Sequence, residues 1–365
     1  MRIGGRAYRS IWPAAGGDAV ETIDQTLLPH RFATRRIDSL VTAAEAITTM
    51  VVRGAPLIGA TAAFGLALAL RRAADDAALE AGSRLLAATR PTAVNLRHAL
   101  NDVSAVVAPL PQHERAAAAW ARAVAFCDED VALNRRIGEA GLPLIEALHR
   151  ELGRPVNILT HCNAGWLATV DWGTATAPIY MAHDRGVPLR VFVDETRPRN
   201  QGAALTAFEL GQHGVPYSVI VDNAGGHLMQ HGQIDLAIVG ADRVTARGDA
   251  ANKIGTYLKA LAARANGVPF YVAVPSPTFD WTISDGLAEI PIEERSAEEV
   301  THVVGRLDDG RIARVAVTPA GAEAVNPAFD VTPAELIDGF ITDRGIVAAD
   351  AAALARAFGR TIISA

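Results

Sequence analysis

The chain has 365 residues, of which 50% are hydrophobic and 20% charged, so it can bury a substantial core and global disorder is excluded. Its formal net charge is -6 and no run of lysine or arginine is present, which argues against nucleic acid as the main partner. The longest apolar run, residues 55–70, contains a proline and two glycines and is shorter than the ~20 residues of a membrane span. We therefore expect a buried helix there and no membrane partner.

Residues 1 to about 35 have the composition of strands and turns, whereas the pattern from Ile37 to about Arg150 is helical. Apolar residues at a spacing near 3.6 run from Ile37 through Leu40 to Val51, and the polar pair Asp38 and Ser39 marks the start of this helix. Alanine-rich segments then follow at 60–70, 76–88, 93–107 and 114–126. This pattern predicts a smaller, mainly helical N-terminal domain over residues 1–150 with a short strand-rich start.

The composition changes after Gly153, where short runs of β-forming residues begin to alternate with helical segments. The five runs are residues 156–160, 189–193, 217–221, 235–239 and 270–274. Alternating strands and helices indicate an α/β fold with a doubly wound parallel sheet and right-handed crossovers. We expect this second domain to occupy residues 151–365.

Two of these runs end in side chains that could do chemistry. Cys162 follows the first run and Asp242 follows the fourth, so both are expected at the carboxyl edge of the sheet, where open α/β folds bind ligands. For Cys162 the alternative is a small buried hydrophobe. Its place before Asn163 predicts the start of a helix, where a thiolate is favoured. For Asp242 the alternative is a turn or helix-capping residue.

Cations follow in patterns that suit an anion. Asp249 is expected to cap a helix running through Tyr257, which would put Asn252 and Lys253 in its first turn beside free amides. The alternative for Lys253 is a solvated helix lysine. Two further turns carry arginines that could reach a phosphate, and these are Val52-Arg-Gly-Ala-Pro-Leu-Ile-Gly59 and Thr89-Arg-Pro-Thr-Ala-Val-Asn95.

Metal and nucleotide sites are not indicated. The cysteines, Cys127 and Cys162, lie far apart and form no CxxC pair, so no zinc site is expected. Cys127 stands next to Phe126 in a helical segment, where packing explains it. No Walker loop or GxGxxG fingerprint is present, and we expect no metal, nicotinamide or other cofactor. Free thiols and a start without an apolar signal segment favour a cytoplasmic protein.

Six motifs, in order along nearly the whole chain, closely resemble the methylthioribose-1-phosphate isomerases. They are Val52-Arg-Gly-Ala-Pro-Leu-Ile-Gly59, Thr89-Arg-Pro-Thr-Ala-Val-Asn-Leu96, His161-Cys-Asn-Ala-Gly165, Asp194-Glu-Thr-Arg-Pro-Arg-Asn-Gln-Gly202, Val239-Gly-Ala-Asp-Arg243 and Asn252-Lys-Ile-Gly-Thr256. The resemblance implies a Rossmann-like C-terminal domain, a homodimer, and conversion of 5-methylthioribose 1-phosphate into 5-methylthioribulose 1-phosphate in methionine salvage. It matches Cys162 and Asp242 to the catalytic pair. The positions matched to substrate binding are Arg53, Gly54, Ala55, Arg90, Gln201, Asn252 and Lys253.

The same superfamily contains ribose-1,5-bisphosphate isomerases and regulatory subunits of a translation-initiation exchange factor, which leaves two alternatives. One is an isomerase of a related sugar phosphate, such as 5-deoxyribose 1-phosphate or ribose 1,5-bisphosphate. The other is a non-catalytic regulatory subunit, although such subunits generally lack the catalytic pair. Trp166 and Trp172 depart from the family pattern, and we expect them to reshape the pocket near the 5-position of the sugar.

The implied chemistry assigns Asp242 as proton donor to the ring oxygen and Cys162, as thiolate, as base at C2 or stabiliser of a cationic centre. The ordinary pKa values of Cys and Asp favour the opposite protonation by about 6 kcal/mol. Apolar burial of Asp242 and a cation or helix terminus at Cys162 would be needed to invert them. Without that inversion Asp242 is the base and Cys162 a neutral donor. The hydrogen at C2 can leave as a proton or move to C1 as hydride.

Overall fold

The computed structural model describes residues 1–90 and 94–360, and its N-terminal part begins with short strands. β3, β4 and β5 form a three-stranded antiparallel sheet, and β1 pairs with β2. Their bounds are β1 (Arg2–Ile3), β2 (Arg6–Ala7), β3 (Ile11–Pro13), β4 (Val20–Ile23) and β5 (Thr34–Ile37). The strand-rich start expected from composition is confirmed.

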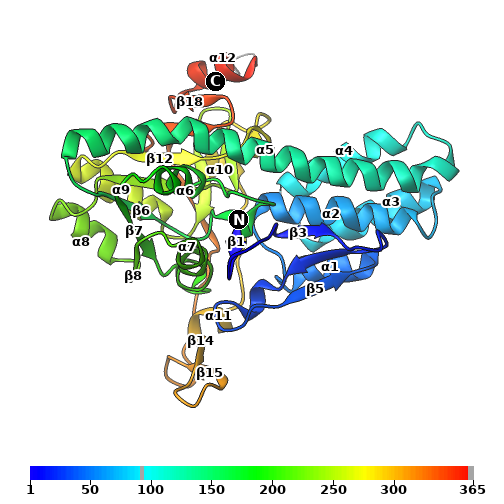
Figure 1. Ribbon diagram of the computed structural model, residues 1–365, viewed down its shortest axis with the longest axis horizontal. Helices are drawn as coiled ribbons and strands as arrows, with labels where there is room; N and C mark the ends of the chain where they lie inside the picture. The colour runs from blue at the N-terminus through cyan, green and yellow to red at the C-terminus, as the bar shows by residue number, and fades with distance from the viewer. Residues whose placement is uncertain (91–93, 361–365) are drawn as a thin grey trace.

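Helices make up the rest of this part, and they pack around α2 (Ala55–Leu70) (Figure 1). All residues of α2 except Pro56 and Ala69 are buried, as expected for a helix that is apolar on every face. The neighbouring helices are α1 (Leu40–Thr48), α3 (Asp76–Thr89), α4 (Val94–Val107) and α5 (Gln112–Leu152). Residues 91–93 of the second arginine-bearing turn lie outside the described residues.

The 41-residue helix α5 runs along both halves of the molecule (Figure 1). Its first half buries Ala119, Ala123 and Cys127 in the core around α2. Its second half buries Ile137 and Ile145 in the core beneath the large sheet. The expected division into residues 1–150 and 151–365 stays a prediction.

The large sheet has seven strands in the order β18-β17-β12-β9-β6-β7-β8, all parallel except β18. Five of them coincide with the predicted runs to within one residue, so the predicted α/β class is confirmed. The strands are β6 (Val156–Thr160), β7 (Leu189–Asp194), β8 (Tyr217–Ile220), β9 (Leu236–Val239), β12 (Phe270–Ala273), β17 (Gly339–Thr342) and β18 (Gly345–Val347).

Helices cover both faces of this sheet. Ile158 of β6 packs with α5, α6 and α7, whereas the next residue, Leu159, packs with α8, α9 and α12. The chain winds outward from β6 to β7 and β8, and then from β9 to β12 and β17 on the other side. The winding therefore reverses between β6 and β9, and ligands bind at such a switch point. The covering helices are α6 (Ala177–Asp184), α7 (Ala207–His213), α8 (Ala224–Gln230), α9 (Thr256–Asn266) and α12 (Ala351–Phe358).

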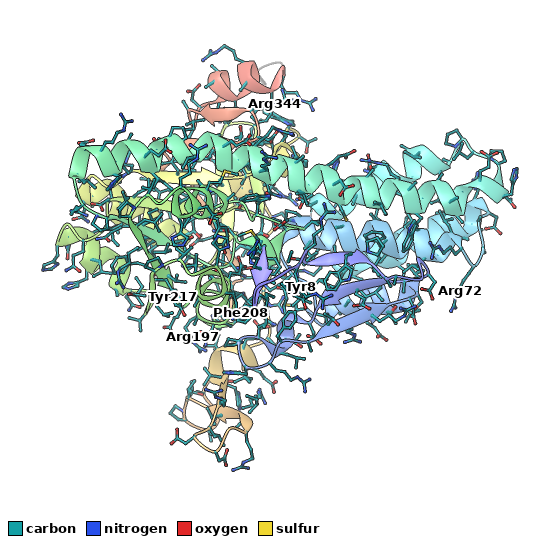
Figure 2. All side chains as sticks on the ribbon, viewed as in Figure 1. Tyr8, Arg72, Arg197, Phe208, Tyr217 and Arg344 are labelled. Carbon is teal, nitrogen blue, oxygen red and sulfur yellow. The ribbon has the colours of Figure 1, made fainter. Side chains whose placement is uncertain are left out.

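A second, four-stranded sheet of order β13-β10-β11-β16 lies next to the carboxyl ends of β9 and β12. Beyond it a hairpin of β14 and β15 projects from the body (Figure 1). The elements are β10 (Arg243–Thr245), β11 (Ala250–Lys253), β13 (Phe279–Asp280), α10 (Gly286–Glu289), α11 (Glu298–Thr301), β14 (His302–Arg306), β15 (Ile312–Ala316) and β16 (Phe329–Thr332). Side chains fill the spaces between elements, from Arg72 at one end of the long axis to Tyr217 on β8 (Figure 2). Within the described ranges, no helix has the length and apolar character of a membrane span.

Candidate active site

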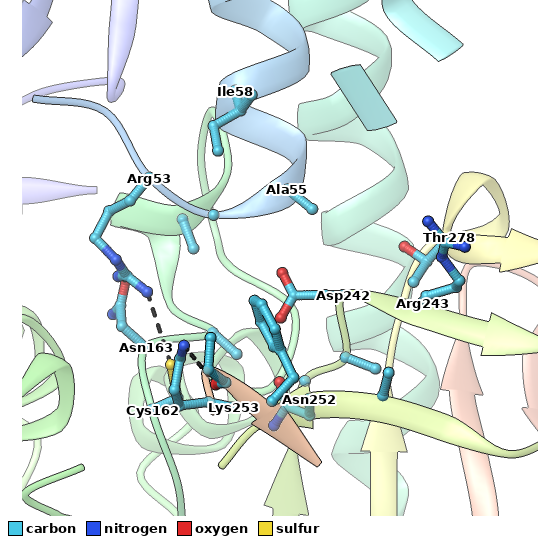
Figure 3. Close-up of a pocket in the computed structure, with 18 of the residues that line it drawn as sticks. Arg53, Ala55, Ile58, Cys162, Asn163, Asp242, Arg243, Asn252, Lys253 and Thr278 are labelled. Carbon is cyan, nitrogen blue, oxygen red and sulfur yellow. Dashed lines mark hydrogen bonds between the residues drawn. The ribbon is translucent and has the colours of Figure 1, made fainter. Parts of the chain in front are cut away.

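A cavity opens at the switch point between β6 and β9, and the second sheet and the start of α2 close its other sides (Figure 3). All nine residues singled out in the sequence line it, namely Arg53, Gly54, Ala55, Arg90, Cys162, Gln201, Asp242, Asn252 and Lys253. They come from six separate stretches of the chain. The fold thus brings Cys162 and Asp242 together at the sheet edge, as expected, and gathers around them the residues matched to substrate binding.

Cys162 stands two residues past β6 and is only 7% exposed. Its φ of 65° places it in the left-handed region, which costs a non-glycine residue about 1–2 kcal/mol. Two threonine hydroxyls hold this conformation. The Cys162 N–H donates to Thr196 Oγ1 at 2.9 Å, and Thr206 Oγ1 donates to the Cys162 carbonyl at 2.7 Å. The sulfur is therefore aimed into the cavity by a strained but well-supported turn.

Arg53 approaches the sulfur from the N-terminal half (Figure 3). Its Nη2 lies 3.7 Å from Cys162 Sγ, and its Nη1 donates to Asn163 Oδ1 at 2.8 Å. The next residue, Gly54, has a φ of 87°, and a Cβ there would stand 2.4 Å from the Ala168 carbonyl oxygen. Only glycine allows this approach, which carries the guanidinium to the thiol and starts α2 at the cavity.

Asp242 follows β9 on the side of the cavity opposite Cys162 (Figure 3). Its backbone N–H donates to the Ala251 carbonyl at 2.9 Å. Within residues 1–90 and 94–360 its carboxyl group accepts no hydrogen bond, although a small solute in the cavity could reach it. Burial raises the pKa of Asp242, and the positive charges of Lys253, Arg90 and Arg53 oppose that rise. A protonated Asp242 is thereby favoured relative to an ordinary aspartic acid.

Lys253 and its neighbour Asn252 form another wall from β11. Lys253 Nζ donates to the Ala328 carbonyl at 2.7 Å and lies 4.2 Å from the centre of the Phe329 ring. Burial lowers the pKa of Lys253, while the negative charges of Cys162 and Asp242 raise it. Asn252 Nδ2 donates to Thr256 Oγ1 at 2.9 Å, so its amide is held in place.

Two wall residues carry buried polar atoms without a partner among the described residues, and these atoms are Arg90 Nε and Gln201 Oε1. Arg90 Nη2 also lies 3.4 Å from Glu293 Oε2, in a weak ion pair. A buried donor or acceptor without a hydrogen bond costs about 1–3 kcal/mol. Both atoms are thus suited to a polar ligand that would satisfy them.

The comparison with known proteins agrees with this geometry. Residues 51–349 match the Initiation factor 2 subunit family. A methylthioribose-1-phosphate isomerase of Methylorubrum populi is 63% identical over 355 residues, which cover 97% of each chain. One of Rhodospirillum rubrum is 61% identical, over 97% of this chain and 93% of the relative. The chain belongs to the methylthioribose-1-phosphate isomerase family.

Two solved structures have folds similar to that of this chain. The 5-methylthioribose 1-phosphate isomerase of Pyrococcus horikoshii superposes with a TM-score of 0.82 at 40% identity, covering 97% of this chain and 96% of that one. The delta subunit of translation initiation factor eIF-2B from A. fulgidus has a TM-score of 0.76 at 36% identity, covering 94% and 96%. Membership of the isomerase family confirms the resemblance read from the six motifs.

Three local predictions for this isomerase-family chain are wrong. Cys162 does not start a helix, because its turn leads into a 3-10 turn at Trp166–Ala168 and α6 begins only at Ala177. Asn252 and Lys253 lie on strand β11 rather than in the first turn of a helix, and α9 begins at Thr256 behind Gly255. Asp249 accordingly does not cap that helix; its side chain accepts from the Gly286 and Ala334 N–H groups.

The two tryptophans that depart from the family pattern do not line the cavity. Trp166 is 1% exposed and packs in the core beneath the sheet. Trp172 has a φ of 69° in the loop that follows, and its backbone N–H donates to Asp171 Oδ1 at 2.8 Å. The expectation that they reshape the pocket near the sugar 5-position is therefore wrong.

Several cavity residues were not found from the sequence. The segment after α10 contributes Ile290, Pro291, Ile292, Glu293 and Arg295, and Met50, Asn163, Arg199 and Phe329 lie on other walls. Asn163 had a usable signal, because it directly follows Cys162 at the strand end. The segment after α10 had none, since no strand of the large sheet precedes it.

A group of three side chains with metal-ligand atoms lies behind Cys162 and comprises His161, Asp194 and Asp222. Lys259 Nζ stands 3.1 Å from Asp194 Oδ2 and donates to the Asp222 carbonyl. His161 Nδ1 is 2.8 Å from Asp194 Oδ2, and its Nε2 is 2.8 Å from the Ile254 carbonyl. The lysine thus supplies positive charge to this acidic group, and the histidine ties the end of β6 to the end of β11.

Proposed function

We propose that this chain is an aldose-ketose isomerase that converts 5-methylthioribose 1-phosphate into 5-methylthioribulose 1-phosphate, as its relatives' names indicate. The observation that carries the proposal is the pairing of Cys162 with Asp242 across one cavity. The regulatory alternative would leave this pair without a task. The reaction belongs to methionine salvage and needs no cofactor.

The surroundings of the pair support the assignment of Asp242 as acid and Cys162 as thiolate. Asp242 lines the cavity, its pKa is raised by burial, and its carboxyl group has no hydrogen-bond partner among the described residues. The Arg53 guanidinium beside Cys162 Sγ stabilises a negative sulfur. The cation at Cys162 that the assignment requires is therefore a side chain and not a helix terminus.

The reaction consists of four proton transfers between the sugar and these two side chains. The phosphate on O1 prevents simple ring opening, so Asp242 protonates the ring oxygen as the bond from C1 to that oxygen breaks. The Cys162 thiolate removes the proton from C2, which gives an enol phosphate between C1 and C2. The resulting thiol returns that proton to C1, and the 2-hydroxyl proton returns to Asp242 as the C2 ketone forms. Each such proton transfer contributes about 10²–10⁴-fold.

The phosphate is assigned to the start of α2 and the cations around it. The first amides of a helix have no intrahelical partner, and the helix dipole favours an anion there. Arg53 and Lys253 add full positive charges, and Arg90 Nε offers an unsatisfied donor. Asn252 and Gln201 are assigned to the sugar hydroxyls.

Apolar side chains on the same cavity suit the methylthio group, and these are Met50, Ile58, Ile290, Pro291 and Ile292. The cation on this wall, Arg295, lies 4.0 Å from Met50 Sδ and is already paired with Glu293 and Glu299, so a second phosphate at the 5-position would have to compete with two carboxylates. This arrangement supports the methylthio sugar over ribose 1,5-bisphosphate and leaves 5-deoxyribose 1-phosphate as the nearer competitor.

The test is a turnover panel with methylthioribose 1-phosphate, 5-deoxyribose 1-phosphate and ribose 1,5-bisphosphate, followed by NMR. We expect ketose to form fastest from the methylthio sugar. Faster turnover of either other sugar would reassign the substrate, and no ketose from any of the three would favour the regulatory alternative. Substrate labelled with deuterium at C2 tests the route, because label is lost to water only in a proton route, when the Cys162 thiol exchanges with solvent before it protonates C1.

A cytoplasmic homodimer completes the proposal and follows from the family resemblance. Light scattering of the purified protein should give twice the 38.4 kDa mass of one chain. A monomeric mass with full turnover would remove the dimer from the proposal.

A further inference from the structure

Glu209 is a fully buried carboxylate on α7 that does not line the cavity, yet it bonds to the turn that carries Cys162. Four donors surround it. Its Oε1 accepts from Asn163 Nδ2 at 2.6 Å and from the Leu167 N–H at 3.1 Å. Its Oε2 accepts from the Trp166 N–H at 2.8 Å and from the Tyr180 hydroxyl at 3.0 Å. Every bond that it makes is one in which it accepts.

This arrangement fixes the direction of the Asn163 amide. Asn163 Nδ2 donates to Glu209 Oε1 and, at 3.2 Å, to Thr206 Oγ1, so Asn163 Oδ1 must face the other way. That oxygen accepts from Arg53 Nη1 at 2.8 Å. A guanidinium can only donate, so a reversed amide would place donor against donor. Glu209 therefore decides which face Asn163 offers to Arg53.

The turn itself is shaped around the same carboxylate. A Cβ at Gly165 would stand 1.9 Å from Glu209 Oε2, so no other residue fits at that position without displacing Glu209. Burial raises the pKa of Glu209 to about 7, although its hydrogen bonds lower it. Keeping a carboxylate in this setting has an energetic cost, which its four hydrogen bonds offset.

We propose that Glu209 is a positioning residue of this active site, which acts through Asn163 to hold the Arg53 guanidinium against the Cys162 sulfur. The proposal rests on the proposed function only in its prediction about turnover. The carboxylate touches neither the cavity nor the sulfur, and its influence passes along the chain Glu209–Asn163–Arg53–Cys162.

An amide cannot replace this carboxylate. In Glu209→Gln one of the two carboxylate oxygens becomes an NH₂ group, and each oxygen position faces a backbone N–H, that of Leu167 or that of Trp166. Either orientation sets donor against donor. We expect the turn to shift and Arg53 to leave the sulfur.

The experiment measures thiol reactivity and turnover in a Cys127→Ser background, where Cys162 is the remaining thiol. Alkylation of Cys162 by iodoacetamide is timed at pH 7 and at pH 10, and the ratio of the two rates reports how well the site stabilises the thiolate at neutral pH. We expect E209Q and N163A each to lower this ratio about fivefold. We also expect kcat to fall about 10- to 100-fold with KM changed far less.

Asp130→Asn is the matched control, because Asp130 is also a buried carboxylate that accepts a backbone N–H, that of Val170. It should leave the alkylation ratio unchanged. The double variant E209Q/N163A should be no worse than the more damaged single variant, since both changes break one chain of contacts. Unchanged alkylation ratios in E209Q and N163A, or effects that multiply in the double variant, would overturn the proposal.

If E209Q fails to fold by circular dichroism, N163A carries the test, because Asn163 can be truncated without removing the support of the Trp166 and Leu167 amides. Alkylation needs no sugar, so a lowered ratio in a protein that isomerises none of the three sugars would retain the positioning role and reject the proposed function.

Discussion

The two cysteines of this chain are nearly equally buried, yet their surroundings differ in every other respect. Cys127 is 3% exposed on the regular helix α5, inside the apolar core around α2. Burial raises the pKa of its thiol, and it stays neutral. Cys162 is 7% exposed in a left-handed turn, with Arg53 at 3.7 Å and Lys253 on the same cavity. Burial alone therefore does not decide what a thiol does; the neighbouring charges do.

The same contrast separates two aspartates, Asp130 and Asp242. Asp130 on α5 accepts from the Val170 N–H at 2.7 Å, and burial raises its pKa to about 7. Burial also raises the pKa of Asp242, but this carboxyl group faces the charges of Lys253, Arg90 and Arg53 across an open cavity. One carboxyl group holds a loop to a helix, whereas the other remains free to exchange a proton with a bound molecule.

The largest difference is expected between substitutions of the two cysteines. Cys162→Ser should lower kcat by about 10³-fold while the sugar phosphate still binds, because a hydroxyl is a far weaker base than a thiolate. Cys127→Ser should keep full turnover and lose about 1 kcal/mol of stability. Initial rates measure the turnover of each variant, and titration calorimetry measures its binding of the sugar phosphate. Near-normal turnover in Cys162→Ser would remove Cys162 from the mechanism.

Asp242→Asn should lower kcat by about 10²-fold, because the amide cannot give a proton to the ring oxygen. Asp130→Asn should change turnover little, which separates the acid from the structural carboxylate. In the parent protein the donor must be protonated, so kcat should fall as the pH rises through the raised pKa of Asp242. The profile of kcat against pH checks this. A high-pH limb that persists in Asp242→Asn would belong to another group.

Much of this arrangement could be predicted because strand ends are marked locally. Five short β-forming runs are each followed by residues typical of turns, and the parallel pairing of the first with the fourth brings Cys162 and Asp242 to one edge. The second sheet could not be predicted in this way. β11 is a strand because it pairs with β16, whose residues 329–332 are far away in sequence, and Ala250 and Ala251 taken alone suit a helix.

Glu209 illustrates the other limit. Its partners Asn163, Trp166 and Leu167 lie more than forty positions earlier, and no local pattern reports that their donors converge on one carboxylate. The single available signal was a charged residue between Phe208 and Leu210 in an apolar segment. Such a residue predicts a buried partner but not which one.

Lys253→Met should weaken binding of the phosphorylated sugar by about 10- to 100-fold and leave the unphosphorylated sugar unaffected, because the ammonium contributes a charge-assisted contact to the phosphate. Methionine keeps most of the packing against the Phe329 ring. Titration calorimetry with both sugars measures the difference. Equal weakening of the two would mean that Lys253 positions the wall and does not contact the phosphate.

The smallest expected effect is the contribution of Asp130 to the pH dependence of the unfolding free energy. Its pKa is about 7 in the folded protein and near the ordinary 3.8 when unfolded, so between these values the folded state holds one more proton than the unfolded state. Stability from this group is therefore present at low pH and is lost as the pH rises toward 7, by at most about 1.4 kcal/mol per pH unit.

Asp130→Asn removes the titration while its amide oxygen can still accept from the Val170 N–H. Urea unfolding of both proteins from pH 4 to pH 8 gives the difference in unfolding free energy, in which all other titrating groups cancel. The variant should gain stability relative to the parent as the pH rises and level off above pH 7. A flat difference would show that Asp130 is ionised throughout, held by its hydrogen bonds against the cost of burial. The contrast with Asp242 would then lie in the cavity and not in the protonation of the two carboxyl groups.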